Sequence, residues 1–455
     1  MNEVRLLAVT AILGYGFPEE SLRAGLARKP HMIGVDGGSV DPGPYFLGAG
    51  KAFCSNLAMR RDLRLMLNAG VEAGIPVAVS TAGGAGGSPH VANIVDMVRQ
   101  IAQEDGLHFK LAIIHSEQAQ ADVIEWVEAG RVNALGSRPP LTTDTVERAT
   151  RIVGAMGPEP YMDALDAGAD VIISGRSTDP APWVAMVRRA GLPEAQAWYA
   201  GKMLECGAEP ALPKKEDCLF VTVGADYVEC EPTSQERRCT PLSVANFSLH
   251  ENASPVHHFE PGGMLDTTEC VFEAVSDRAV RITGMKWLPA SQYTVKLEGV
   301  EQTGFRALAI CGTRDPVLID TIEPYLERSR EIVAEKTAAF GVSPESYGLS
   351  FRVYGRNGVM GAREPVTEIT SHELGFVIEV VASTQDEANA VVAIARTTLL
   401  HSDFPGRLCK EGNMAIPFSP SDIELGPHYR FSVYHIVDTD SPTAMFPIEY
   451  EQVGG

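Results

Sequence analysis

The chain has 455 residues, of which 45% are hydrophobic, and a formal net charge of −21 at pH 7. This length is enough for about two or three domains, each with its own core, and excludes a disordered or fibrous protein. The acidic balance opposes nonspecific adsorption to nucleic acid or anionic lipid, so we expect neither as a partner.

The sequence gives no indication of a membrane span or of export. Apolar stretches are interrupted every few residues by Gly or by charge, far short of the roughly 20 residues that a span requires. Glu3 stands where a secretory signal has positive charge. The eight cysteines are scattered without Cys-x-x-Cys spacing, which is typical of reduced thiols rather than disulfides or a zinc cluster. We therefore expect a cytoplasmic protein.

Residues 1–212 repeat one pattern, in which a short apolar run meets a Gly, Ser or Pro turn and then a helical periodicity. The pattern predicts an open, doubly wound, mostly parallel α/β sheet. The strands are predicted at residues 6–10, 32–36, 77–80, 111–115, 132–135 and 171–174, with helices such as 58–73 and 90–104 between them.

A Pro-rich, charged run within residues 209–217 is typical of an exposed linker, so we place the domain boundary after residue 212. Residues 213–455 are predicted to form an α+β domain. Its order of strand 306–311, helix 317–339, strands 347–354 and 375–382, and helix 385–400 suggests a ferredoxin-like fold. Gly and Pro recur through residues 405–447, which predicts a long tail that wraps back over the body.

Two segments of the first domain share the pattern Ser-x-Asp-Pro-small-Pro-aromatic, at residues 39–45 and 177–183. Each follows a predicted strand, and loops at the carboxyl ends of parallel strands form the ligand crevice of such sheets. Asp41 and Asp179, with Ser39 and Ser177, are therefore candidates for one site. Asp-Pro is also an ordinary helix start, and this structural interpretation stays open for each copy taken alone. The recurrence of the whole pattern favours a site.

A glycine-rich loop at residues 80–90 lies between a predicted strand and a helix. Backbone N–H groups of successive glycines, together with the helix N-terminus, favour a bound anion. The candidate binding residues are Gly83, Gly84, Gly86, Gly87 and Ser88. The spacing matches neither the dinucleotide fingerprint nor a P-loop, and a merely tight turn is the alternative.

Two further side chains are candidates at the same face of the sheet. Arg176 could pair with an acidic substrate, because guanidinium binds carboxylates at two points, although a solvated turn arginine is the alternative. His90 could relay protons near neutral pH. No serine-hydrolase elbow and no helical zinc motif is present, so no cofactor is expected, while a divalent metal between Asp41 and Asp179 stays open.

Several motifs together resemble the acyclic terpene utilisation (AtuA-like) family. They are Ser-x-Asp-Pro-Gly-Pro at residues 39–44, Gly-Arg-Ser-Thr-Asp-Pro at 175–180, Glu-Pro-Gly-Gly at 260–263, Val-Lys-Leu-Glu-Gly at 295–299 and Pro-Phe-Ser-Pro-Ser-Asp-Ile at 417–423. The resemblance implies catabolism of branched or carboxylated carbon skeletons, in some cases beside acyl-CoA enzymes. Longer relatives include an additional small ferredoxin-like module, so the resemblance leads us to expect a separate small ferredoxin-like partner subunit for this chain.

These observations predict a catabolic enzyme for a small carboxylate or acyl-CoA-type substrate, in a homo-oligomer. Asp41, Asp179 and His90 would be the acid/base residues, and the reaction would be an addition, elimination or isomerisation of the lyase, hydratase or isomerase type. Two alternatives stay open: a hydrolase that uses carboxylate-activated water, and a noncatalytic subunit of a complex.

Overall fold

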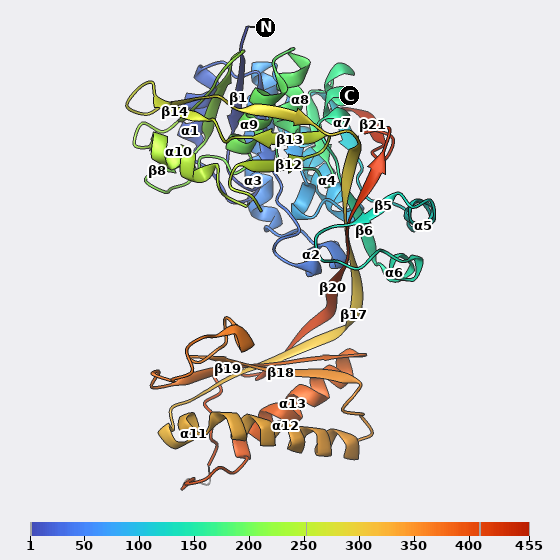
Figure 1. Cartoon of the computed structure of the whole chain (residues 1–455), viewed down its shortest axis with the longest axis vertical. Helices are drawn as coiled ribbons and strands as arrows, with labels where there is room; N and C mark the ends of the chain where they lie inside the picture. The colour runs from blue at the N-terminus through green and yellow to red at the C-terminus, as the bar shows by residue number, and fades with distance from the viewer. Residues whose placement is uncertain (1, 252, 409–410, 455) are drawn as a thin grey trace. The chain divides into compact units, whose positions relative to one another are not determined.

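The computed structural model describes residues 2–251, 253–408 and 411–454, which form two compact units. Unit 1 consists of Met1–Glu301 and Phe431–Gly455, and unit 2 of Gln302–Arg430 (Figure 1). The boundary expected after residue 212 lies inside unit 1. The reason is that β9 (Leu219–Val223) pairs antiparallel with β1 (Val4–Ala8) along its whole length and so continues the sheet of the preceding segment.

Unit 1 is built on a ten-stranded sheet in the order β14-β15-β10-β9-β1-β2-β3-β7-β4-β21. Five neighbouring strands are parallel: β1, β2 (Met32–Asp36), β3 (Val77–Ser80), β7 (Val171–Ser174) and β4 (Phe109–Ile114). The others are antiparallel: β9, β10 (Val228–Pro232), β15 (Val280–Thr283), β14 (Val271–Ala274) and, at the opposite edge, β21 (Ile448–Val453). The prediction of an α/β class is confirmed, but the sheet is mixed rather than mostly parallel, because later segments extend both edges of the parallel core.

Helices cover both faces of the parallel core, as the alternation of buried side chains requires. Leu6 and the strand residues on the same face of the sheet belong to one hydrophobic core. This core includes α7 (Glu159–Asp166), α8 (Ala181–Arg189) and α9 (Glu194–Leu204). Leu7 and its like-facing neighbours belong to a second core with α1 (Glu19–Ala27), α3 (Asn56–Ala73) and α4 (Ser88–Asp105). The helices predicted at residues 58–73 and 90–104 are thus confirmed.

Two strands of the first half lie outside the large sheet. The strand predicted at residues 132–135 is β5 (Val132–Ala134), and it pairs antiparallel with β20 (Asp422–Thr439) instead of joining the parallel core. Similarly, β6 (Arg151–Ala155) pairs with the first part of β17 (Tyr293–Thr313). The predicted placement of residues 132–135 in the doubly wound sheet is therefore wrong, because their partner comes from the other end of the sequence.

The remaining elements of unit 1 are short. They are α2 (Pro44–Ala49), α5 (Gln120–Glu128), α6 (Thr143–Arg148), α10 (Pro241–Phe247), the strand pair β8 (Ala211–Leu212) and β11 (Arg238–Cys239), and a small sheet of β12 (His257–Glu260), β13 (Gly263–Asp266) and β16 (Lys286–Pro289). The turn between β12 and β13 contributes to the candidate site.

Unit 2 is an antiparallel sheet in the order β18-β19-β17-β20, with its helices packed on one face (Figure 1). Its further elements are α11 (Pro316–Asp320), α12 (Ile322–Ala339), β18 (Tyr347–Tyr354), β19 (Leu374–Ala382) and α13 (Gln385–His401). Alternate residues of β19, such as Phe376 and Ile378, pack with α12 and α13 in a separate core. The long tail predicted at residues 405–447 includes one regular strand, β20.

None of the helices in the described part of the chain combines the length and apolar character that crossing a bilayer demands. The seven cysteines that the structure describes are free thiols, and Cys409 lies outside the described residues.

Candidate active site

A cavity of about 650 Å³ in unit 1 lies where loops from the parallel core meet the β12–β13 turn. Its charged lining comes from the loops after β2 and β7, from α9, from the β12–β13 turn and from the start of β17. The lining side chains with charge are Asp41, Arg176, Asp179, Lys202, Glu251, Glu260 and Lys296. Apolar parts of the wall come from residues such as Leu135, Phe259 and Ile436. A cavity that combines apolar walls with convergent charged groups suits a small organic ligand with a polar end.

The two copies of the repeated pattern meet at this cavity. Ser39 and Asp41 follow β2, Arg176 and Asp179 follow β7, and all four line its wall. Within the described structure neither aspartate caps its helix: the N-caps are Gly43 for α2 and Pro180 for α8, without a side-chain hydrogen bond. The helix-start interpretation therefore does not account for the two aspartates.

Arg176 ties the second copy to β17. Its Nε donates to Glu298 Oε2 at 2.7 Å, and its Nη1 contacts Asp179 Oδ1 at 3.1 Å and the Ser177 carbonyl at 2.6 Å. Although burial raises the pKa of Glu298, the charges of Arg176 and Lys296 hold it at about 2. Lys296 Nζ lies 2.7 Å from Glu298 Oε1. Glu298 is thus a permanent anion that fixes two of the three cations of the cavity wall, Arg176 and Lys296.

Buried hydrogen bonds hold the backbone of the two loops. Ser177 is buried, and its hydroxyl accepts a 3.0 Å hydrogen bond from Tyr161 in α7. Asp36, at the end of β2, accepts a 2.7 Å hydrogen bond from Ser80. Burial, together with the nearby charge of Asp179, raises the pKa of Asp36 well above its ordinary value. These groups position the loops beneath the cavity.

Glu260 is the carboxyl group best suited to proton transfer near neutral pH. Its Oε2 accepts a 2.5 Å hydrogen bond from Thr178, which belongs to the loop after β7. Burial is the main reason that its pKa is raised to about 7, and the negative charges of Glu205 and Asp179 add to the shift while Lys202 opposes it. Burial also raises the pKa of Asp179, against the opposing charge of Arg176. The cavity therefore holds two carboxyl groups in different environments.

Lys202 supplies a buried positive charge beside these carboxyls. Its Nζ lies 2.6 Å from Glu205 Oε1, one turn further along α9. Although burial lowers the pKa of Lys202, the charges of Glu205 and Glu260 raise it above its ordinary value. Sequence reasoning missed Lys202, and it used Glu260 only as part of a motif that carries the family resemblance, not as a candidate site residue. The available signal was a lysine in an otherwise almost wholly buried helix.

The glycine-rich loop lies elsewhere. The described lining of the cavity does not include Gly83, Gly84, Gly86 or Gly87. A Cβ on Gly86 would lie 2.1 Å from the backbone nitrogen of Arg176. The loop is therefore packed against the turn that follows β7. The anion predicted for this helix start is a side chain of the chain itself, because Ser88 N donates to Glu117 Oε2 at 2.7 Å. Glu117 is in turn held by Arg151 Nε at 3.0 Å.

His90 is likewise remote from the described cavity lining. It is buried in the first turn of α4, where its Nε2 lies 3.1 Å from the Phe46 carbonyl and 3.0 Å from the Lys51 carbonyl. Burial lowers the pKa of His90. Its contacts tie α4 to the α2 segment, which is a structural role.

Among the described residues, a group of possible metal ligands gathers beside this cavity. Asp179 is engaged by Arg176, whereas Glu205, Cys206 and His250 place one ligand atom each within 4.8 Å of one another. Glu205 is the partner of Lys202, so this group lies directly behind the cavity wall.

Residues 53–211 match the family model described as acyclic terpene utilisation family protein AtuA. This match confirms the family resemblance over a segment that includes Arg176, Asp179 and Lys202, whereas Asp41 and Glu260 lie outside it. Comparison of the chain with curated proteins and with solved structures gives no match. The family description names acyclic terpene utilisation and does not specify a reaction.

Proposed function

We propose that the chain is an acid/base enzyme that acts on a small branched carboxylate or its thioester, by addition, elimination or isomerisation next to the carboxyl carbon. The observation that supports this most is the pair of carboxyl groups, Glu260 and Asp179, in one cavity beside Lys202. Carboxyls in unequal environments can divide the donor and acceptor roles.

In this mechanism Asp179 accepts the proton and Glu260 donates one. The carboxylate of Asp179 removes a proton from the carbon next to the carboxyl group, and the electrons of the broken C–H bond move to the carbonyl oxygen. Lys296 and Lys202 stabilise the resulting enolate oxygen. Glu260, whose pKa of about 7 leaves it largely protonated below neutrality, then protonates the acceptor carbon or the departing group.

The substrate class follows from the lining and from the family description. A carboxylate or thioester carbonyl would face Lys296 and Lys202, while Leu135, Phe259 and Ile436 would contact a branched hydrocarbon chain. The family description suggests that this chain derives from an acyclic terpene. Lys202 and Lys296 would be the binding groups for an anionic substrate in this strongly acidic protein.

Unit 2 in this proposal is a ferredoxin-like module. Its element order of β17, α12, β18, β19, α13 and β20 and its strand order of β18-β19-β17-β20 support this assignment. A fold of this kind does not indicate a reaction, so the proposed chemistry is confined to unit 1.

Solvent exchange tests the proposal. The protein is incubated in D2O with a panel of acyclic terpene carboxylates and their CoA thioesters, and deuterium in carbon–hydrogen bonds is measured by mass spectrometry. We expect incorporation with at least one member of the panel. Glu260→Gln and Asp179→Asn should lower its rate by about 10²- to 10⁴-fold, the usual contribution of a positioned acid or base.

The matched control is Glu273→Gln, on the exposed edge strand β14, which should exchange at the wild-type rate. Release of a free acid from the thioesters without carbon-bound deuterium would instead support the hydrolase alternative. Wild-type exchange rates in both Glu260→Gln and Asp179→Asn would refute the assigned roles.

A further inference from the structure

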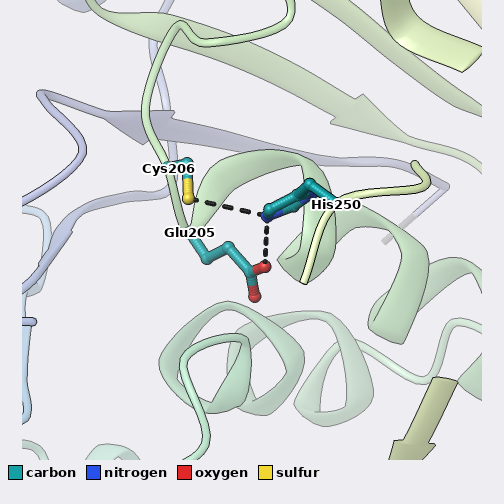
Figure 2. A group of neighbouring side chains, drawn as sticks. All are labelled: Glu205, Cys206 and His250. Atoms are coloured by element: carbon teal, nitrogen blue, oxygen red, sulfur yellow. Dashed lines mark hydrogen bonds and ion pairs between the residues drawn. The ribbon is translucent and has the colours of Figure 1, made fainter. Parts of the chain in front are cut away.

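Three side chains with metal-binding atoms converge behind the cavity wall, at the end of α9. Figure 2 shows the His250 ring facing both the Cys206 thiol and the Glu205 carboxylate. His250 Nε2 lies 3.7 Å from Cys206 Sγ and 3.2 Å from Glu205 Oε1. The three ligand atoms all lie within 4.8 Å of one another.

The imidazole is oriented as in a metal ligand. His250 Nδ1 lies 2.5 Å from the Phe247 carbonyl, and a carbonyl can only accept, so the Nδ1 position holds the proton. Nε2 faces Cys206 Sγ and the Glu205 carboxylate. A proton on Nε2 would donate to that carboxylate, and its loss makes Nε2 the electron-pair donor for a metal ion. The ring also stacks on Phe247 at a centroid distance of 4.1 Å. Such a hydrogen bond at the far nitrogen is how metal-binding histidines are usually held.

The spacing of the ligand atoms fits a tetrahedral ion. Bonds of about 2.3 Å to sulfur, 2.0–2.1 Å to nitrogen and 2.0–2.2 Å to oxygen place neighbouring ligand atoms about 3.3–3.6 Å apart. The separations of 3.7 Å and 3.2 Å lie close to that range. Thiolate, imidazole and carboxylate together are a donor set that suits Zn²⁺ rather than Mg²⁺ or Ca²⁺.

A second observation at Glu205 indicates that this carboxylate requires a further partner. The residue is 3% exposed, and its Oε2 has no hydrogen-bond partner in the described part of the protein. Lys202 Nζ lies 2.6 Å from Oε1, the oxygen that also faces His250, and outer partners of this kind hold metal-bound carboxylates. Buried carboxylate oxygens normally have a hydrogen-bond or metal partner, so an ion bound by both oxygens of Glu205 would satisfy Oε2.

The same geometry disfavours a thiol nucleophile. In a nucleophilic triad the acid orients the far nitrogen of the histidine, but here Glu205 and Cys206 approach the same nitrogen. We propose that Glu205, Cys206 and His250 bind one divalent, zinc-type ion per chain. Binding converts the thiol to a thiolate and releases its proton, together with any proton on His250 Nε2, to solvent. Cys206 also lines a second cavity of about 650 Å³, which provides a path for entry of the ion and a position for a fourth ligand.

Metal binding can be measured on the whole chain without any substrate, so its outcome is distinct from that of the exchange assay. The chelator-treated protein is titrated with Co²⁺ and with Zn²⁺. We expect one ion per chain, tetrahedral Co²⁺ bands with a thiolate-to-cobalt charge-transfer band, and displacement of Co²⁺ by Zn²⁺ but not by Mg²⁺. Cys206→Ser should abolish the charge-transfer band and weaken Zn²⁺ binding by about 100-fold or more, because it removes a ligand.

Cys270→Ser removes another half-buried thiol and should keep the charge-transfer band and the affinity. His250→Gln should weaken binding while circular dichroism shows an unchanged fold. If the wild-type protein binds no Co²⁺ or Zn²⁺ at micromolar concentration, or if Cys206→Ser binds as tightly as the wild type, the site does not exist.

Discussion

The single residue Arg176 neutralises two carboxylates of the site. Its guanidinium is buried and contacts two carboxylates, Glu298 and Asp179. Replacing it by methionine leaves both anions without their main cation. We expect Arg176→Met to lower the free energy of unfolding by about 3–5 kcal/mol, as loss of one partner of a buried pair does.

Urea unfolding at pH 7 measures this effect. Arg328→Met is the control, because Arg328 pairs with Glu331 on the exposed face of α12 and its loss should leave the midpoint unchanged. Equal, small effects of the two substitutions would show that Arg176 does not hold the network together.

Glu260 makes stability depend on pH. Its pKa is raised to about 7 by burial, from an ordinary value of 4.5, so the fold favours the protonated form. This contribution is complete below pH 4.5 and is lost as the pH rises through 7. Glu260→Gln keeps a neutral side chain, so at pH 8 it should be more stable than the wild type by about 1–3 kcal/mol, and the difference should vanish near pH 4.5.

Thermal unfolding at the two pH values tests this, with Glu273→Gln as a variant that should show no such dependence. A Glu260→Gln protein that is less stable than the wild type at pH 8 would mean that the carboxylate form is the one the fold stabilises.

Some of the residues that line the cavity could be predicted from the sequence. Asp41 and Asp179 could be predicted because a repeated pattern at the ends of parallel strands places side chains at one edge of the sheet. Glu260 and Lys202 could not, since their proximity depends on a turn and a helix brought together by tertiary packing. His90 and the glycine-rich loop have the right residue types, but His90 Nε2 faces the Phe46 and Lys51 carbonyls and the Ser88 N–H donates to Glu117.

At the scale of elements, the start of α4 already contains its anion. Glu117 accepts the Ser88 N–H and pairs with Arg151. Glu117→Ala should lower the free energy of unfolding by about 1–2 kcal/mol, because a carboxylate at a helix N-terminus is lost. Added sulfate should recover part of the loss by binding in its place.

Urea unfolding with and without sulfate, at constant ionic strength, measures the recovery. Glu72→Ala, at an exposed position of α3, should lose little stability and gain none specifically from sulfate. A Glu117→Ala protein that responds to sulfate no more than Glu72→Ala would show that the helix start does not bind anions.

Most elements were predictable because their apolar periodicity is local. Strands 32–36, 77–80, 171–174 and 347–354 have the predicted bounds. The strand predicted at residues 306–311 is the last part of β17, one strand of 21 residues whose apolar pattern is interrupted by Gly299 and Gly304. β20 was missed for a similar reason, because Gly and Pro residues obscure its alternation.

At the scale of the whole molecule, unit 2 has a hydrophobic core of its own. The core residues from Ala307 to Met414 all belong to Gln302–Arg430. We therefore expect a fragment of residues 302–430 to fold alone, with dispersed amide resonances and one cooperative unfolding transition. A fragment with collapsed resonances and no transition would contradict this.

The division of the chain into units was the least predictable feature. A Pro-rich run near residue 212 suggested a boundary, but pairing of β9 with β1 depends on contacts between strands more than 200 positions apart. Local composition contains no information about such pairing.

The proposed proton-transfer chemistry depends on an acid that titrates near neutrality in the cavity of unit 1. The most direct measurement is a carbon-13 NMR titration of labelled glutamate carboxyl groups, with the Glu260 signal assigned by its loss in Glu260→Gln. We expect a midpoint near pH 7 for this signal, because burial raises the pKa of Glu260 to about 7. A midpoint near 4.5, the value of an ordinary glutamate, would contradict it.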